Sequence, residues 1–220
     1  MTVPEESRDL LAFEKAARKQ GYKLIAGIDE AGRGPLAGPV VAAACIIPRN
    51  FIIPDVDDSK KLMPEKRKEI FEFIRSEKKI LWAVGIISHE IIDAINIFQA
   101  TIQAMLQAVE KLIKQPDVLL VDGLKLPHPT IHSQKIIGGD ALSQSIAAAS
   151  IIAKETRDEM MREYHKEFPL YGFDRHKGYC TEMHLKNLAK HGPCPIHRRS
   201  FEPVNAVSAE ISAPALSLSI

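Results

Sequence analysis

The stretch Gly27–Pro39, GIDEAGRGPLAGP, joins two apolar segments and decides how the chain can fold. Lys23–Asp29 (KLIAGID) leads into it and Val40–Ile47 (VVAAACII) follows it. Both segments have the length and the composition of buried strands. The glycines in the turn leave backbone N–H groups open to a phosphate. Their spacing matches neither a Walker A loop nor the GxGxxG dinucleotide motif, so a nucleotide cofactor site is poorly supported.

The rest of the chain alternates strands with helices. Further strands are expected at Ile80–Ser88, Asp117–Asp122 and Gln134–Ile137. Apolar residues at helical spacing, together with Pro64 and Gly21 as start and stop signals, predict helices over residues 5–20, 64–76, 99–114 and 142–168. This order favours an α/β layered sheet over a helical bundle or a β-sandwich.

Composition places the chain among ordinary globular proteins. It has 220 residues, of which 45% are hydrophobic, and 29 Lys and Arg against 28 Asp and Glu. No apolar run approaches the roughly 20 uncharged residues of a spanning helix, so no membrane association is expected. Met1–Arg8 does not have the pattern of a signal peptide, and we expect a cytoplasmic protein. Three cysteines without CxxC spacing indicate reduced thiols rather than disulfides or a zinc site.

The charge is unevenly distributed along the chain. Residues 161–199 contain eight Lys or Arg against four Asp or Glu, and five of the eight histidines. We expect a single domain over residues 1–203 that includes this segment, about 161–203, as a helical C-terminal part. Residues 204–220 have little apolar bulk and no periodicity, which predicts a mobile tail.

Carboxylates follow three of the expected strands. Asp29 and Glu30 close the first, Asp122 closes the fourth, and Asp140 lies after the fifth. Each has a structural alternative, since Asp122 could begin a turn at Gly123 and Asp140 could cap the next helix. The carboxyl ends of sheet strands are where sites form in α/β folds. Four converging carboxylates would repel one another unless they bound hard divalent cations such as Mg²⁺.

At this point the chain resembles the bacterial ribonuclease HII family, the type 2 ribonucleases H. The matching stretches run in order from Lys23 to Phe201: GIDEAGRGPLAGP at 27–39, DSKKL at 58–62, VDG at 121–123, GDA at 139–141, AAASIIAK at 147–154, YGFDRHKGYCT at 171–181 with His184, and GPCPIHR at 192–198. The resemblance implies a ribonuclease H-like mixed sheet of three antiparallel strands plus two parallel ones, flanked by helices. It also implies cleavage of RNA in RNA–DNA hybrids and 5′ of single ribonucleotides in duplex DNA, with Mg²⁺ or Mn²⁺, leaving a 3′-hydroxyl and a 5′-phosphate.

The family's site residues fall on matching positions. The resemblance implies that Asp29, Glu30, Asp122 and Asp140 are catalytic and hold two metal ions, and that Gly32, Arg33 and Gly34 contact the substrate. It places the family's substrate-sensing tyrosine on Tyr179. As further hypotheses, Ser59, Lys60 and Lys61 contact backbone phosphates, and His184 and His176 assist substrate binding or product release, although a structural role is an equal alternative for both histidines.

Two other functions stay open at this stage. One is another nuclease of the same superfold, such as a junction resolvase, which would share the carboxylates but not the DEAGRG and HKGY motifs. The other is a non-catalytic nucleic-acid-binding module, although uncompensated carboxylates would repel its ligand. The expected partners are RNA–DNA hybrids and DNA that contains ribonucleotides, bound by a monomer.

Overall fold

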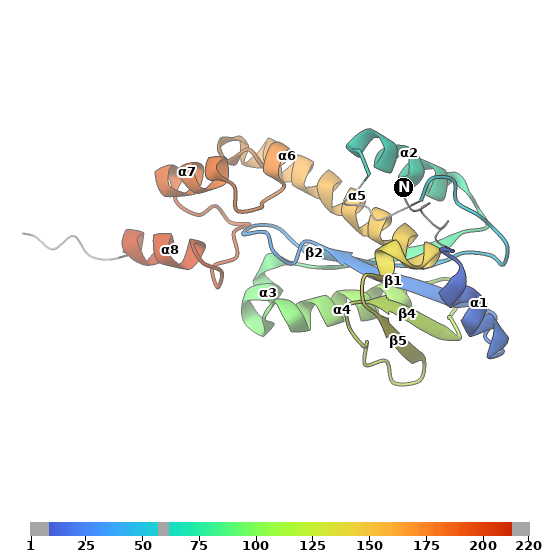
Figure 1. Cartoon of the computed structure of the whole chain (residues 1–220). Coiled ribbons are helices and arrows are strands. Elements are labelled where there is room, and N and C mark those ends of the chain that lie inside the picture. Colours follow the sequence, from blue (N-terminus) through green and yellow to red (C-terminus); the bar gives the residue numbers. More distant parts are fainter. Residues whose placement is uncertain (1–8, 57–61, 213–220) are drawn as a thin grey trace, which may run out of the picture.

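A five-stranded mixed sheet forms the centre of the molecule in the computed structural model, which describes residues 9–56 and 62–212 (Figure 1). The strands are β1 (Ile25–Ala31), β2 (Val40–Ile46), β3 (Leu81–Ile87), β4 (Val118–Asp122) and β5 (His132–Ile136), in the spatial order β3-β2-β1-β4-β5. β3, β2 and β1 pair antiparallel, and β4 and β5 add in parallel next to β1. The expected sheet of three antiparallel and two parallel strands is confirmed.

Helices cover both faces of this sheet. The helices of the described residues are α1 (Ala12–Lys19), α2 (Pro64–Ser76), α3 (His89–Ile95), α4 (Ile97–Glu110), α5 (Gln144–Glu167), α6 (Phe173–His176), α7 (Glu182–His191) and α8 (Val204–Ser212), with single 3₁₀ turns at Gly139–Ala141 and Pro169–Tyr171. Figure 1 shows α3 and α4 below the sheet and α5 above it, with α2 beyond α5. None of the helices in the described ranges is long and apolar enough to cross a membrane.

Alternating side chains of the central strands belong to two hydrophobic cores, one on each face of the sheet. Ala42 and Ala44 of β2 pack with α4, and Ala43 and Cys45 pack with α5 and α2. This alternation follows from the two-residue period of a strand. A strand that is buried on both faces needs apolar residues at every position, which explains the unbroken sequence VVAAACI of β2.

A glycine on each face brings a helix close to the sheet. A Cβ atom added to Gly27 of β1 would lie 2.1 Å from the backbone carbon of Ser145 in α5. One added to Gly85 of β3 would lie 1.9 Å from the carbonyl oxygen of Ala104 in α4. Close packing of α5 sets the end of β1, and with it Asp29, directly against Ser150.

The C-terminal part packs on the turn between β1 and β2. Ala37 of that turn forms an isolated antiparallel bridge with His197, and the Leu36 N–H donates to the carbonyl of Gly178 at 2.8 Å. The structure differs from the expected tail in one respect, because residues 204–212 form α8. Val204 is fully buried against Leu36 and Leu188, and this contact anchors the first turn of α8. Residues 213–220 lie outside the described part of the chain.

Candidate active site

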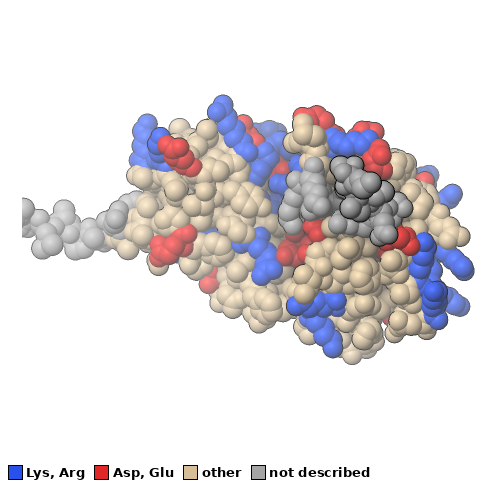
Figure 2. Space-filling view, in the orientation of Figure 1, with Lys and Arg blue, Asp and Glu red and all other residues tan. Residues whose placement is uncertain are grey.

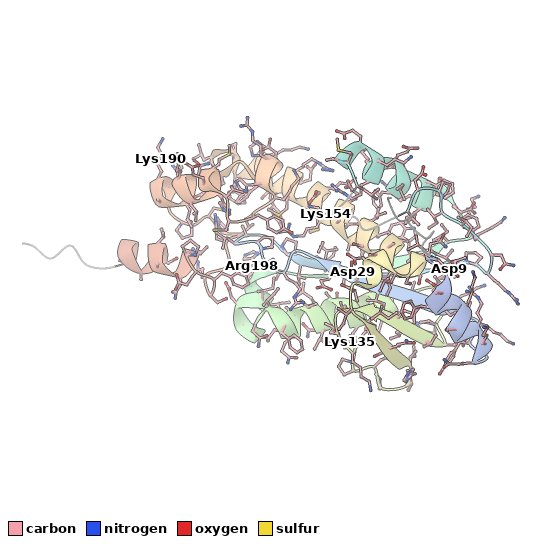
Figure 3. The ribbon with its side chains drawn as sticks, in the orientation of Figure 1. Asp9, Asp29, Lys135, Lys154, Lys190 and Arg198 are labelled. Carbon is pink, nitrogen blue, oxygen red and sulfur yellow. The ribbon has the colours of Figure 1, made fainter. Side chains whose placement is uncertain are left out.

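A cleft of about 390 Å³ opens where β1 and β4 end side by side. Its lining residues come from β1, the glycine-rich turn, β4, α5 and the loop after α6: Asp29, Glu30, Ala31, Gly32, Arg33, Gly34, Asp122, Ser150, Lys154 and Tyr179. Figure 3 shows Asp29 on β1 beneath Lys154 on α5. The structure therefore brings most of the residues expected from the sequence to one cleft.

Asp29 is the most enclosed carboxylate of the cleft, with 4% of its surface exposed. Its Oδ1 accepts a hydrogen bond from the Glu30 N–H at 2.7 Å, and Ser150 donates to the same side chain. Burial raises the pKa of Asp29 well above its ordinary value, and the negative charges of Glu30 and Asp122 raise it further. The cleft thus brings three acidic side chains close enough that the charges of two of them raise the pKa of the third.

The other carboxylates have partners of their own. Glu30 Oε1 lies 3.3 Å from Arg33 Nη1. Asp122 Oδ1 accepts the Gly139 N–H at 2.6 Å, which ties the end of β4 to the 3₁₀ turn that carries Asp140. Asp140 is buried, with 5% exposed, and is not among the residues that line the cleft.

The structural alternatives for these residues are partly resolved. The N-cap of α5 is Ser143, whose hydroxyl accepts the Ile146 N–H, so Asp140 does not cap this helix. Gly123 does adopt a positive φ of 66° directly after Asp122. Asp122 therefore precedes a turn and also lines the cleft, which shows that the two interpretations of this residue are compatible.

The donor set suits a hard divalent cation. Asp29, Glu30 and Asp122 offer only oxygen ligands, which Mg²⁺ and Mn²⁺ prefer. Within residues 9–56 and 62–212, no three His, Cys, Asp or Glu side chains are arranged as they stand so that they could hold a metal ion.

Arg198 holds the glycine-rich turn through hydrogen bonds to its backbone. Its guanidinium is fully buried and donates to the carbonyls of Gly32 at 2.6 Å, Arg33 at 2.9 Å, Gly38 at 3.0 Å and Pro39 at 3.2 Å. These bonds join both ends of the turn to one planar group. A planar fork of N–H donors is the feature that distinguishes arginine from lysine in such a position.

Arg157 on α5 connects the same turn to the loop that carries Tyr179. It donates to the carbonyls of Pro39 at 2.9 Å, Ala37 at 3.0 Å and Lys177 at 3.0 Å. Burial lowers the pKa of Arg157 to about 10 and that of Arg198 to about 9, so both are charged at neutral pH. Gly32 is required here, because its φ is +96° and an added Cβ would lie 2.1 Å from Arg157 Nε.

Tyr179 lies at the edge of the cleft with 41% of its surface exposed. The Arg157 guanidinium and the Lys154 ammonium lie 5.8 and 5.9 Å from the centre of its ring. Both distances are within the range of cation–π attraction. The ring of Tyr179 is therefore held against two cations, while part of its surface is left exposed for a ligand.

Three buried histidines form a hydrogen-bonded and stacked cluster against the loop that carries Tyr179. His184 Nδ1 lies 2.9 Å from the Tyr179 carbonyl, so it must donate, and its Nε2 then accepts from His197 Nε2 at 3.0 Å. His197 Nδ1 in turn accepts the Cys194 N–H at 3.0 Å. His176 stacks on His184, with ring centres 4.4 Å apart, and accepts the Gly178 N–H. All three rings are neutral in this network.

The structure does not bring every expected residue to the cleft. His184 is fully buried and holds Tyr179 through the backbone instead of facing a substrate. Ser59, Lys60 and Lys61 lie outside the described residues. Two further residues line the cleft, and three others position its parts, although the sequence alone indicates no individual role for them. The lining residues are Ser150 and Lys154, and the positioning residues are Arg157, His197 and Arg198.

The strand order together with the carboxylates at the edge of β1 and β4 defines a nuclease with ribonuclease H architecture. The family model for ribonuclease HII matches residues 26–204. Ribonuclease HII of Chlamydia trachomatis serovar L2 is 59% identical over 192 residues, which cover 87% of this chain and 88% of that protein. The chain belongs to the ribonuclease HII family and is an endoribonuclease that acts on RNA–DNA hybrids.

Solved structures agree on the fold. Ribonuclease H2 from Pyrococcus horikoshii OT3 superposes with a TM-score of 0.72 at 24% identity, over 87% of this chain and all of that one. Bst-RNase HIII in complex with Mn²⁺ gives a TM-score of 0.69 at 20% identity, over 96% of this chain and 77% of that one. Both likenesses cover the mixed sheet and its flanking helices.

Proposed function

We propose that Asp29, Glu30, Asp122 and Asp140 bind two divalent cations, Mg²⁺ or Mn²⁺, at which the scissile phosphodiester is hydrolysed. The observation that carries the proposal is the cleft in which three of these carboxylates converge beside Lys154 and the glycine-rich turn. The Mn²⁺ complex of the structurally similar Bst-RNase HIII supports the choice of ions. Bound in pairs, such ions can activate water and stabilise the departing oxygen, so no protein nucleophile is needed.

The groups around the carboxylates position the substrate. Lys154 and Arg33 place positive charge at the mouth of the cleft, where a phosphate of the cleaved strand would lie. Because Arg198 holds the carbonyls of Gly32 and Arg33 on the protein side, the turn keeps one conformation while its outer face meets the duplex. A backbone without Cβ atoms at positions 32 and 34 can approach a minor groove closely.

Substrate choice requires recognition of the 2′-hydroxyl, which only RNA supplies. The polar backbone of Gly32–Gly34 is suited to bind it. Tyr179, on the other side of the cleft, would stack on the next sugar and so favour DNA at that position. The resulting activity is cleavage 5′ of a ribonucleotide embedded in duplex DNA, with a 3′-hydroxyl and a 5′-phosphate as products.

The Asp122→Asn variant tests this assignment. The change removes a negative charge and keeps the size of the side chain, so thermal stability and duplex binding should persist while cleavage in Mg²⁺ falls by at least about 100-fold, the scale seen when a catalytic group is removed. Glu159→Gln is the matched control, since Glu159 is an exposed carboxylate on α5 outside the cleft. Near-normal turnover of Asp122→Asn would refute the assignment of Asp122 as a metal ligand.

A further inference from the structure

A second and larger cleft lies beside the catalytic one. It has a volume of about 520 Å³ and lies between the first turns of α2 and the outer surface of α5 and α6. Three acidic residues line it, against six cationic ones: Arg67, Lys68, Lys154, Arg162, Arg175 and Lys177. Figure 2 shows Lys and Arg side chains gathered over α5 and α6 on this side of the molecule.

The two buried carboxylates of this cleft are already compensated. Arg67 Nε lies 2.5 Å from Glu155, and Arg67 Nη2 lies 3.8 Å from Asp158. Asp158 also accepts from Lys154 Nζ at 2.7 Å. Two cations are thereby matched with two buried acids. Among the described residues that line the cleft, the remaining acidic one is the exposed Glu65, against four further cations.

The remaining cations crowd one another. Within the described residues, Lys68, Arg162 and Arg175 form no ion pair. Lys177 donates to the backbone carbonyl of Asp174 and forms no ion pair within the described residues. Burial lowers the pKa of Lys177, and the positive charges of Arg162 and Lys154 add to this effect, although the negative charges of Asp158 and Asp174 oppose it. An arrangement of this kind is relieved when an anion binds among the cations.

The cleft adjoins the catalytic site, because Lys154 lines both clefts. Lys177 stands two residues before Tyr179, and its carbonyl is fixed by Arg157. A nucleic-acid strand that leaves the catalytic cleft past Tyr179 would therefore pass directly over this cationic surface.

We propose that this cleft binds backbone phosphates of the duplex arm that extends beyond Tyr179, with Arg162 and Arg175 as the principal contacts. The proposal rests on the proposed function, which sets where the duplex enters. Duplex DNA carries about one negative charge per 1.7 Å of helix axis, so a cleft of this size would meet more than one phosphate. The contacts are independent of base sequence and supply affinity rather than chemistry.

The test compares two double variants that remove the same charge. Arg162→Ala with Arg175→Ala removes two of the six cations that line the cleft, and Lys78→Ala with Lys114→Ala removes two exposed lysines that line neither cleft. The dissociation constant of a DNA duplex with one ribonucleotide is measured in EDTA at several NaCl concentrations. The logarithm of the association constant is plotted against the logarithm of the NaCl concentration. The magnitude of this slope should decrease by about two for the cleft variant and stay at the wild-type value for the control.

Shortening the duplex locates the contact. The duplex is shortened on one side of the ribonucleotide at a time. The difference in dissociation constant between the cleft variant and the wild type should disappear when one of the two sides is shortened and persist when the other is. A slope equal to that of the control, or a loss that does not depend on either arm, would overturn the proposal. Melting temperatures of all variants exclude unfolding as the cause.

The same measurements separate this proposal from the assignment of the catalytic carboxylates. Binding is measured without metal, so it does not require cleavage. Asp122→Asn should keep the wild-type salt slope while losing cleavage. A cleft variant with a reduced slope, together with an Asp122→Asn variant that cleaves normally, would support the phosphate cleft and reject the catalytic assignment.

Discussion

Replacement of Arg198 by lysine should cost stability and activity together. The guanidinium donates to four backbone carbonyls, three of them within 3.0 Å. An ammonium group has three donors and no planar fork, so at least one buried carbonyl loses its partner while the charge is preserved. The Arg198→Lys variant therefore isolates the geometry of the contact from its charge.

The expected magnitude follows from the number of bonds lost. A hydrogen bond to a charged group contributes about 1.5–3 kcal/mol. Loss of one such bond should lower the free energy of unfolding by about that amount. For a chain of this size the melting temperature should then fall by roughly 3 to 12 °C. Because Gly32 and Arg33 are among the residues released, cleavage of a duplex with one ribonucleotide should fall as well.

Urea unfolding and steady-state cleavage measure the two effects. Arg199→Lys is the matched control, because Arg199 is adjacent and exposed, and its guanidinium contacts only Ser208 among the described side chains. An Arg198→Lys variant with an unfolding free energy within about 0.5 kcal/mol of the wild type, the usual range for surface changes, and with full activity would refute the positioning role of Arg198.

Three further results are expected. Tyr179→Ala should reduce cleavage at a single ribonucleotide more than cleavage of a continuous RNA–DNA hybrid, and an equal loss on both substrates would argue against a role at the junction. His184→Gln should weaken the support of the Tyr179 carbonyl, and it should change the ratio of activities on these two substrates in the same direction. The free energy of unfolding should decrease as the pH is lowered from about 6.5 to about 4. The reason is that burial lowers the pKa of His176, lowers the pKa of His184 to about 4 and lowers the pKa of His197 to about 3. The unfolded histidines bind protons in this interval and the folded ones do not, whereas Asp29, whose pKa is raised in the folded chain, acts in the opposite direction. The comparison is therefore made in an Asp29→Asn background, where equal free energies of urea unfolding at pH 7 and pH 5 would contradict the neutral histidine network.

The sheet could be predicted from sequence because its pattern is local. The apolar runs that form β1, β2 and β4 are short, contain few polar residues and are bounded by glycine, proline or acidic residues. The helix α3 was not predicted, since its seven residues are too few for a periodicity to emerge. The helix α4 ends at Glu110 instead of Lys114, and α8 forms where a tail was expected, because Val204 finds a buried place that no local pattern indicates.

The site likewise has residues that could be predicted from sequence and residues that could not. Asp29, Glu30 and Asp122 could be placed from sequence, because residues that end neighbouring parallel strands meet at the same end of the sheet, whereas Asp140 is buried in a 3₁₀ turn and does not line the cleft. The roles of Arg157 and Arg198 could not, since their partners are backbone carbonyls between 20 and 166 residues away and carry no side-chain signature. For His184 the sequence leaves assistance to the substrate and a structural role as equal alternatives. The structure buries this side chain, with contacts to the Tyr179 carbonyl and His197 that no local sequence pattern indicates.

If the carboxylate cleft beside the glycine-rich turn binds metal ions and cleaves at ribonucleotides, the most direct test is to incubate the protein with a DNA duplex that carries one ribonucleotide, in Mg²⁺ and in EDTA, and to map the cut. Cleavage 5′ of the ribonucleotide in Mg²⁺, with no cleavage in EDTA and none of an all-DNA duplex, is the predicted result. Equal cleavage of the all-DNA duplex, or cleavage that persists in EDTA, would contradict it.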